Sequence, residues 1–132
     1  MSHGVFVTAI TCMDGRIQEP VSGWLKKRFH ADYVDTITEP CIDGIFSRSQ
    51  YTIMDSIRRR AEISVNAHGS RVLALVSHHD CAGNPVDRDQ HLRDLACSLR
   101  YVQGWNLPVR VVGLFVNEHW EVELISDSGG NA

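Results

Sequence analysis

The chain has 132 residues, of which 43% are hydrophobic, so it can bury one core of ordinary size, and we expect a single domain over residues 1–132. Its formal net charge is −3, and the basic run Arg58-Arg59-Arg60 falls within a helical pattern. This balance gives little support for binding to a nucleic-acid backbone, and no nucleic-acid partner is expected.

Apolar residues indicate the first elements in chain order. Residues 4–12 have the continuous apolar character of a strand buried on both faces. Pro20 fits a first helical turn. The residues that follow it at helical spacing are Val21, Trp24, Leu25 and Phe29. A second, short strand is predicted at 33–38 and ends before Pro40, and the segment 41–46 is predicted to be a loop.

A long helix and a third strand follow. Ser47 and Gln50 have capping-box spacing, which predicts that the helix begins there, and Gly69 is expected to end it. The apolar stripe between them consists of Met54, Ile57, Ala61 and Val65. Residues 71–78 are the clearest strand in the chain, because six of the eight are apolar or small.

The last helix and two further strands complete the pattern. Residues 84–85, Asn-Pro, are predicted to cap the helix, and Gly104 is predicted to close it. Residues 109–117 form a fourth strand, and 120–126 alternate like an edge strand that returns antiparallel through a turn. We therefore expect an α/β fold: a doubly wound, mostly parallel sheet of four strands plus an antiparallel edge strand, with helices on both faces.

Two of these strands end in residues that can bind a metal. The first runs into Cys-Met-Asp-Gly-Arg at 12–16, and the third into His-His-Asp-Cys at 78–81. In an open parallel sheet the functional crevice lies outside the carboxyl ends of the strands, so neighbouring strands would bring Cys12, His78 and Cys81 together. Thiolate and imidazole suit tetrahedral zinc, and a catalytic zinc site keeps three protein ligands and one exchangeable position.

The paired motifs resemble those of the β-class carbonic anhydrases, in which C-x-D-x-R is followed much later by H-x-x-C. The matching residues are Cys12, Asp14 and Arg16 in CMDGR, and His78 and Cys81 in HHDC. The resemblance implies an α/β zinc enzyme that hydrates carbon dioxide to bicarbonate. It also implies that Cys12, His78 and Cys81 are the zinc ligands, and that Asp14 and Arg16 form a dyad beside the metal.

The resemblance covers most of residues 5–125, with three departures. The family has Gly before its histidine and directly after its second cysteine, where this chain has Ser77 and Ala82. Its Arg-Asn-Ala-Gly segment is replaced by residues 38–41, and the N-terminal helical arm that helps many members to dimerise is missing. We expect metal binding to tolerate these changes better than carbon dioxide turnover. A homodimer or higher homo-oligomer is still expected, since a crevice at the edge of a small sheet needs a neighbour to wall it.

The residues around the ligands have expected roles in hydration. Asp14 accepts a hydrogen bond from the metal-bound water or binds zinc itself, and Arg16 holds Asp14 by a bidentate pair. In the open state, hydroxide on the metal attacks carbon dioxide. His79 is the candidate for proton export, because an imidazole titrates near neutrality. Asp80 is a candidate to support His78 from behind.

The remaining cysteines and histidines receive ordinary assignments. Cys41 is kept as a candidate fourth ligand because it follows the second strand, and Cys97 is expected in the core. Ile42, Ile45 and Phe46 are candidates for the apolar wall of the substrate pocket. The histidines expected at the surface are His3, His30, His68, His91 and His119.

The N-terminus lacks a basic segment followed by an apolar one, and no apolar run reaches the roughly 20 residues that span a bilayer. We expect a soluble, cytoplasmic protein with no membrane partner and a small-molecule substrate. In a reducing compartment the four cysteines are expected to be free thiols or metal ligands rather than disulfides.

Three functions stay open at this point. The first is zinc-dependent hydration of carbon dioxide. The second is a zinc hydrolase of the same fold that acts on carbonyl sulfide, carbon disulfide or another small electrophile. The third is a zinc-binding protein with little catalysis, which uses the metal for folding or sensing. Loss of the Arg-Asn-Ala-Gly segment favours the second and third.

Overall fold

The computed structural model describes residues 4–129, which form one five-stranded sheet with the strand order β2-β1-β3-β4-β5. Neighbouring strands are parallel except β4 and β5, which pair antiparallel at one edge. The strands are β1 (Phe6–Cys12), β2 (Tyr33–Glu39), β3 (Val72–His78), β4 (Arg110–Val116) and β5 (Val122–Asp127). The predicted α/β class, with four parallel strands and an antiparallel edge strand, is confirmed.

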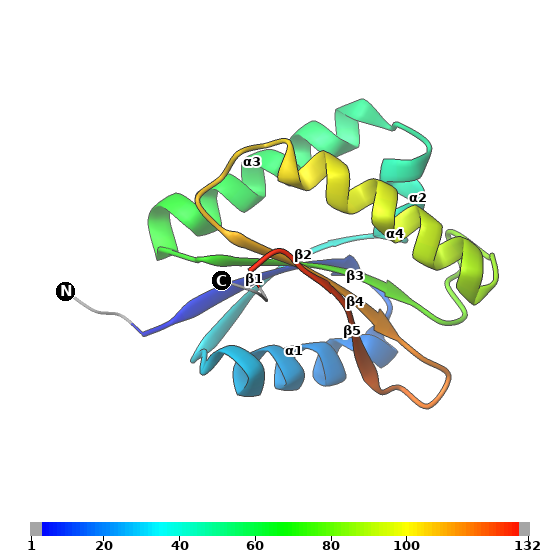
Figure 1. The fold of residues 1–132 in the computed structure, drawn as a ribbon, viewed down its shortest axis with the longest axis horizontal. Helices are drawn as coiled ribbons and strands as arrows, with labels where there is room; N and C mark the ends of the chain where they lie inside the picture. The colour runs from blue at the N-terminus through cyan, green and yellow to red at the C-terminus, as the bar shows by residue number, and fades with distance from the viewer. Residues whose placement is uncertain (1–3, 130–132) are drawn as a thin grey trace.

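Helices cover both faces of the sheet, as Figure 1 shows, with α1 on one side and the other three on the opposite side. The helices are α1 (Gly15–Phe29), α2 (Ile42–Ser47), α3 (Tyr51–His68) and α4 (Arg88–Gln103). Because side chains alternate along a strand, each buried strand supplies both layers. Val7 and Ala9 pack toward α1, whereas Ile10 packs toward the opposite layer of helices. Within the described range 4–129, no helix has both the length and the apolar character needed to cross a bilayer.

Helices α1 and α4 begin at other residues than the sequence pattern predicts. Helix α1 begins at Gly15 rather than at Pro20, because the carboxylate of Asp14 caps it by accepting the backbone N–H of Arg16 at 2.9 Å. Helix α4 begins at Arg88, where the carboxylate of Asp87 accepts the backbone N–H of Gln90. The Asn-Pro pair at 84–85 therefore lies in the loop before the cap.

The predicted loop 41–46 is wrong, because most of it is the short helix α2. Its residues Ile42, Ile45 and Phe46 recur at helical spacing and are all buried. They belong to the core beneath α3 and α4 and do not line the cavity beside the metal-binding motifs, so their predicted role as a pocket wall is also wrong. Helix α3 consequently begins at Tyr51 and not at Ser47.

The order of strands places the two motifs at one crevice. Strand β1 lies between β2 and β3, and it pairs with both in parallel. The connection from β1 to β2 runs through α1 on one face, whereas the connection from β2 to β3 runs through α2 and α3 on the other. This reversal makes the carboxyl ends of β1 and β3 a topological switch point, as the sequence pattern predicts.

Candidate metal centre

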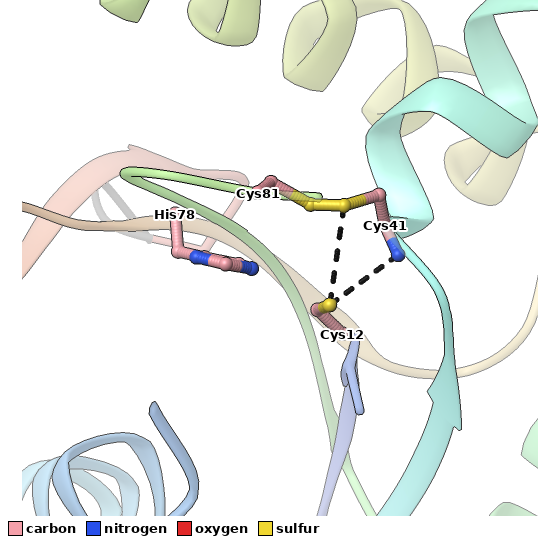
Figure 2. A group of neighbouring side chains, drawn as sticks. All are labelled: Cys12, Cys41, His78 and Cys81. Carbon is pink, nitrogen blue, oxygen red and sulfur yellow. Dashed lines mark hydrogen bonds between the residues drawn. A yellow bond between two sulfur atoms is a disulfide. The ribbon is translucent and has the colours of Figure 1, made fainter. Parts of the chain in front are cut away.

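Four potential metal donors converge at this switch point (Figure 2). Cys12 and His78 are the last residues of β1 and β3, Cys81 lies in the loop after β3, and Cys41 follows β2. All four side chains are buried, and their donor atoms lie within 4.8 Å of one another. The structure thus brings together the three ligands expected from the sequence and adds the candidate fourth, Cys41.

Cys12 interacts with both Cys41 and His78. Its Sγ is 4.0 Å from the Sγ of Cys41, and it accepts the backbone N–H of Cys41 at 3.3 Å. Burial raises the pKa of the Cys12 thiol, but the nearby imidazole of His78 and the N–H of Cys41 outweigh burial, so the pKa is lower than usual. A lowered pKa increases the thiolate fraction, and the thiolate is the form that binds metal.

His78 is oriented toward the cysteines, as Figure 2 shows. Its Nδ1 lies 2.7 Å from the carbonyl oxygen of His79, and only a protonated nitrogen can donate to that acceptor. The other nitrogen, Nε2, is buried and has no hydrogen-bond partner among the described residues. Burial lowers the pKa of His78, but the thiol of Cys12 and the carbonyl of His79 raise it by more than burial lowers it. The pKa of His78 is therefore higher than usual.

This donor set fits zinc. A buried nitrogen without a partner is costly, and a metal ion at the centre of the group would satisfy Nε2 of His78. Sulfur and imidazole donors are those that zinc prefers. Three of these donors would leave one coordination position open, whereas all four would close the site.

Cys41 and Cys81 are joined by a disulfide in the structure, with their Cα atoms 6.3 Å apart. This differs from the expectation that the four cysteines are free thiols or metal ligands. Cys12 and Cys97 are free. Because a disulfide sulfur is not a thiolate, Cys81 can bind metal only when this pair is reduced.

Asp14 and Arg16 form a bidentate pair beside the donors. Nη2 of Arg16 donates to Oδ2 of Asp14 at 2.7 Å, and its Nε donates to Oδ1 at 3.1 Å. The guanidinium lowers the pKa of Asp14 to about 2, so the carboxylate is ionised at neutral pH. Arg16 also stacks on the ring of Trp120, 4.6 Å from its centroid, which further restricts its position.

Asp80 contacts Arg16 of this pair and not His78. Its carboxylate accepts a hydrogen bond from Nη1 of Arg16 at 3.1 Å, and its carbonyl accepts one from Nη2 at 3.0 Å. The predicted role of Asp80 behind His78 is therefore wrong, because the backbone of His79 occupies that place. The side chain of His79 is exposed.

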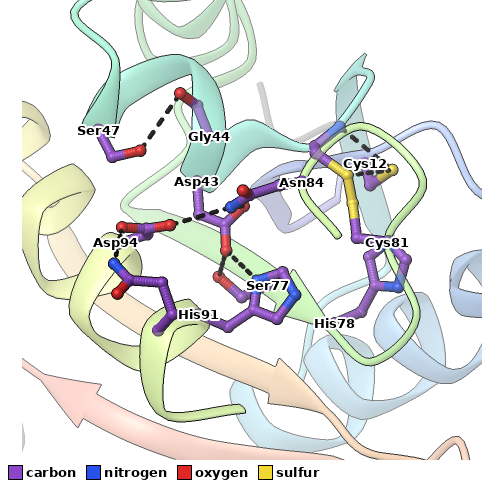
Figure 3. A network of polar contacts seen from close by, with 12 residues as sticks. Cys12, Asp43, Gly44, Ser47, Ser77, His78, Cys81, Asn84, His91 and Asp94 are labelled. Carbon is purple, nitrogen blue, oxygen red and sulfur yellow. Dashed lines mark hydrogen bonds and ion pairs between the residues drawn. A yellow bond between two sulfur atoms is a disulfide. The ribbon is translucent and has the colours of Figure 1, made fainter. Parts of the chain in front are cut away.

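A buried polar network adjoins the donors and was missed by the sequence analysis (Figure 3). It joins Asp43, Ser77, Asn84, His91 and Asp94 through hydrogen bonds. His91 is only 1% exposed, so its predicted place at the surface is wrong. The position of Asp43, two residues after the candidate donor Cys41, is the available signal, but a loop prediction for residues 41–46 gives no reason to bury its carboxylate.

The other minor predictions have mixed outcomes. Cys97 is half-buried on α4 and lies outside both core clusters, so its predicted place in the core is wrong. His30, His68 and His119 are exposed, as predicted. His3 lies outside the described residues.

Comparisons with known proteins agree with this fold. The family model described as "Putative carbonic anhydrase" matches residues 2–126. Among solved structures, the β-carbonic anhydrase CafA of Aspergillus fumigatus matches with a TM-score of 0.52 and 14% sequence identity, over 95% of this chain and 76% of that chain. No curated protein matches. At 14% identity, similarity to the solved structure shows the fold alone. The family model matches nearly the whole chain and therefore shows the family. The chain therefore belongs to this carbonic anhydrase family, and its fold is that of the β-class enzymes.

Proposed function

We propose that the protein hydrates carbon dioxide to bicarbonate with a zinc ion held by Cys12, His78 and Cys81. The observation that carries this proposal is the convergence of these three donors beside the Asp14–Arg16 pair, at the switch point of the sheet. Membership of the family supports the same activity. Each ligand is supplied by the carboxyl end of β1 or β3 or the loop after it, so the sheet fixes their separation.

Zinc, when bound, supplies a Lewis acid that makes a water molecule nucleophilic at neutral pH. Two thiolates offset the charge of the ion, so other groups must assist deprotonation of the water. Arg16 keeps the carboxylate of Asp14 ionised at neutral pH. An ionised carboxylate can accept a hydrogen bond from a water molecule. Asp80 and Trp120 hold Arg16 in turn, which keeps the carboxylate in one orientation.

The substrate would enter a cavity of about 440 Å³ that borders Cys81. Pro85, Val86 and Phe115 give it apolar surface, which suits an uncharged linear molecule such as carbon dioxide. We further propose that the chain acts as a homodimer or higher homo-oligomer, in which a second copy helps to wall the crevice.

The test combines metal analysis with a stopped-flow hydration assay on reduced protein. We expect about one zinc per chain and hydration that falls by roughly 10²-fold or more in Asp14→Asn, with zinc retained. Asp55→Asn, an exposed carboxylate on α3, is the matched control and should behave as wild type. Stoichiometric zinc without hydration at any pH would contradict the proposed activity, and turnover of carbonyl sulfide or carbon disulfide alone would redirect it to those substrates.

A second function is favoured by one specific observation, the presence of Cys41 Sγ in the donor group. Three thiolates and one imidazole close a zinc site, and closed sites stabilise folds rather than catalyse reactions. Cobalt substitution followed by absorption spectroscopy counts the sulfur ligands. Cys41→Ala should leave zinc affinity and hydration near wild type if Cys41 is not a ligand, and should lower zinc affinity sharply if it is.

A further inference from the structure

Asn84 is a buried polar residue in the loop that carries Cys81, and it is only 2% exposed. Residues 81–84 form a tight turn, in which the backbone N–H of Asn84 donates to the carbonyl oxygen of Cys81 at 3.2 Å. Only two residues lie between Asn84 and Cys81 in this turn. A contact that fixes Asn84 therefore also restrains Cys81.

The side-chain amide of Asn84 has a partner for both of its polar atoms. Nδ2 donates to Oδ1 of Asp43 at 3.1 Å and to Oδ2 of Asp94 at 3.0 Å, as Figure 3 shows. Oδ1 accepts a hydrogen bond from Nη2 of Arg48 at 3.1 Å. A guanidinium only donates, so the atom that faces Arg48 must be the oxygen, and the orientation of the amide is determined. These contacts tie the turn to α2, to the residue that caps its C-terminal end, and to α4.

The turn also packs closely on the chain around α2. Nη1 of Arg48 donates to the carbonyl oxygen of Gly83 at 3.3 Å. A Cβ on Gly83 would lie only 3.2 Å from Cβ of Cys41. A Cβ on Gly44, within α2, would lie only 3.2 Å from Cβ of Asn84. The two glycines therefore permit a close approach of backbones, and they hold the turn against the N-terminal end of α2, beside the donor group.

Cys81 depends on these contacts more than the other two proposed ligands do. Cys12 and His78 are the last residues of β1 and β3, so the sheet holds them directly. Cys81 lies three residues beyond the end of β3, where no strand pairing reaches it. Zinc requires its ligands in tetrahedral geometry, so the place of the turn affects how well the three ligands fit the ion.

We propose that Asn84 is a positioning residue of the metal centre, which sets the place of Cys81 and thereby the affinity for zinc. This rests on the part of the proposed function in which Cys81 is a zinc ligand. Asn84 does not contact the ion in this proposal. It acts through the turn, whose position it fixes by its three side-chain hydrogen bonds.

The test measures the zinc affinity of reduced Asn84→Ala by competition with a chromophoric chelator. We expect the affinity to fall roughly 10–100-fold, which is the usual effect of removing a group that orients a metal ligand. Leu99→Ala is the control for a general loss of stability, because it opens a cavity in the core and removes none of the hydrogen bonds of Asn84. Its zinc affinity should stay near wild type.

Arg48→Met provides a second variant that disturbs the buried residues less, because Arg48 is exposed. It removes the donors to Gly83 and to the side chain of Asn84, so zinc affinity should fall in the same direction as in Asn84→Ala. Arg59→Met, at an exposed position on α3, is the matched control and should leave zinc affinity unchanged.

A further readout needs no metal. In the reduced, metal-free protein, alkylation by iodoacetamide followed by peptide mass mapping gives separate rates for Cys81 and Cys12. Asn84→Ala should raise the rate at Cys81 several-fold relative to the rate at Cys12, because the turn opens locally. Leu99→Ala should raise both rates together, because it destabilises the whole domain.

Wild-type zinc affinity in Asn84→Ala, with an unchanged ratio of the two alkylation rates, would overturn the inference, since Asn84 would then support the fold alone. Wild-type zinc affinity in Arg48→Met would overturn it as well. A wild type that binds zinc without hydrating carbon dioxide would contradict the proposed activity and leave this inference standing. A reduced wild type that binds no zinc would overturn both.

Discussion

Replacing Asp43 by Ala should cost the fold much of its stability, because this carboxylate is 2% exposed and organises three donors. The variant leaves Nδ1 of His91, Oγ of Ser77 and one N–H of Asn84 without their acceptor. A single hydrogen bond to a charged group is worth about 1.5–3 kcal/mol, and this carboxylate accepts three, although its own desolvation cost disappears with it. We therefore expect the free energy of unfolding to fall by about 3–5 kcal/mol.

Urea denaturation of the reduced, metal-free protein measures this change without interference from zinc. Asp55→Ala, on the exposed face of α3, should stay within about 0.5 kcal/mol of wild type. The lowered pKa of Asp43 also gives a pH dependence. Its contribution is present above the unfolded pKa of an aspartate, about 3.9, and is lost as pH falls through the lower folded pKa. A loss below about 1 kcal/mol at neutral pH, or an unchanged acid limb in the variant, would refute this reasoning.

Two further predictions concern the candidate metal centre. Zinc should bind only after reduction, because the disulfide between Cys41 and Cys81 removes both thiolates; equal zinc uptake by oxidised and reduced protein, measured with a chelator competition, would contradict this. Arg16→Met should raise the pKa of Asp14 from about 2 toward 3.8 in an NMR titration of the side-chain carboxyl, since the guanidinium is the main cause of the shift. The associated loss of stability should be small, because the side chain of Arg16 is 47% exposed and solvent screens the pair.

The sequence predicts most of the sheet because the strands carry their own signal. Strand β3 is buried at every position, and its apolar run identifies it without any knowledge of its neighbours. The convergence of Cys12, His78 and Cys81 is also predictable, since a parallel sheet brings the carboxyl ends of adjacent strands to one edge. The first residues of α1 and α4 are harder to predict. Asp14 and Asp87 cap these helices through side-chain hydrogen bonds, and the spacing of apolar residues does not show where a side chain points.

The sequence does not predict the buried polar network of Asp43 and His91, for a different reason. Asp43 and His91 are separated by 48 residues, and each taken alone is a polar residue of the kind usually found at a surface. Only the packing of α2 beside α4 brings them together. Local periodicity contains no information about such a pair. A histidine without a neighbouring partner in the sequence, such as His91, is therefore predicted to lie at the surface. The same limit applies to Cys41, whose place after β2 made it a candidate donor but could not reveal that α2 begins there.

Cys41 has a backbone conformation that bears on its role. Its φ is 52°, in the left-handed region that favours glycine, and its side chain is 2% exposed. A side chain in this region costs about 1–2 kcal/mol, and such strain is often found where a residue has a function. Cys41→Gly would relieve the strain, whereas Cys41→Ala would keep it, and both remove the sulfur.

In urea denaturation of the reduced, metal-free protein, Cys41→Gly should therefore be more stable than Cys41→Ala by about 1 kcal/mol. Zinc affinity, by contrast, should change equally in the two variants, because only the thiol can bind the ion. If Cys41→Gly were the less stable of the two, the backbone of residue 41 would not be strained. If their zinc affinities differed widely, the backbone and not the sulfur of Cys41 would shape the metal centre.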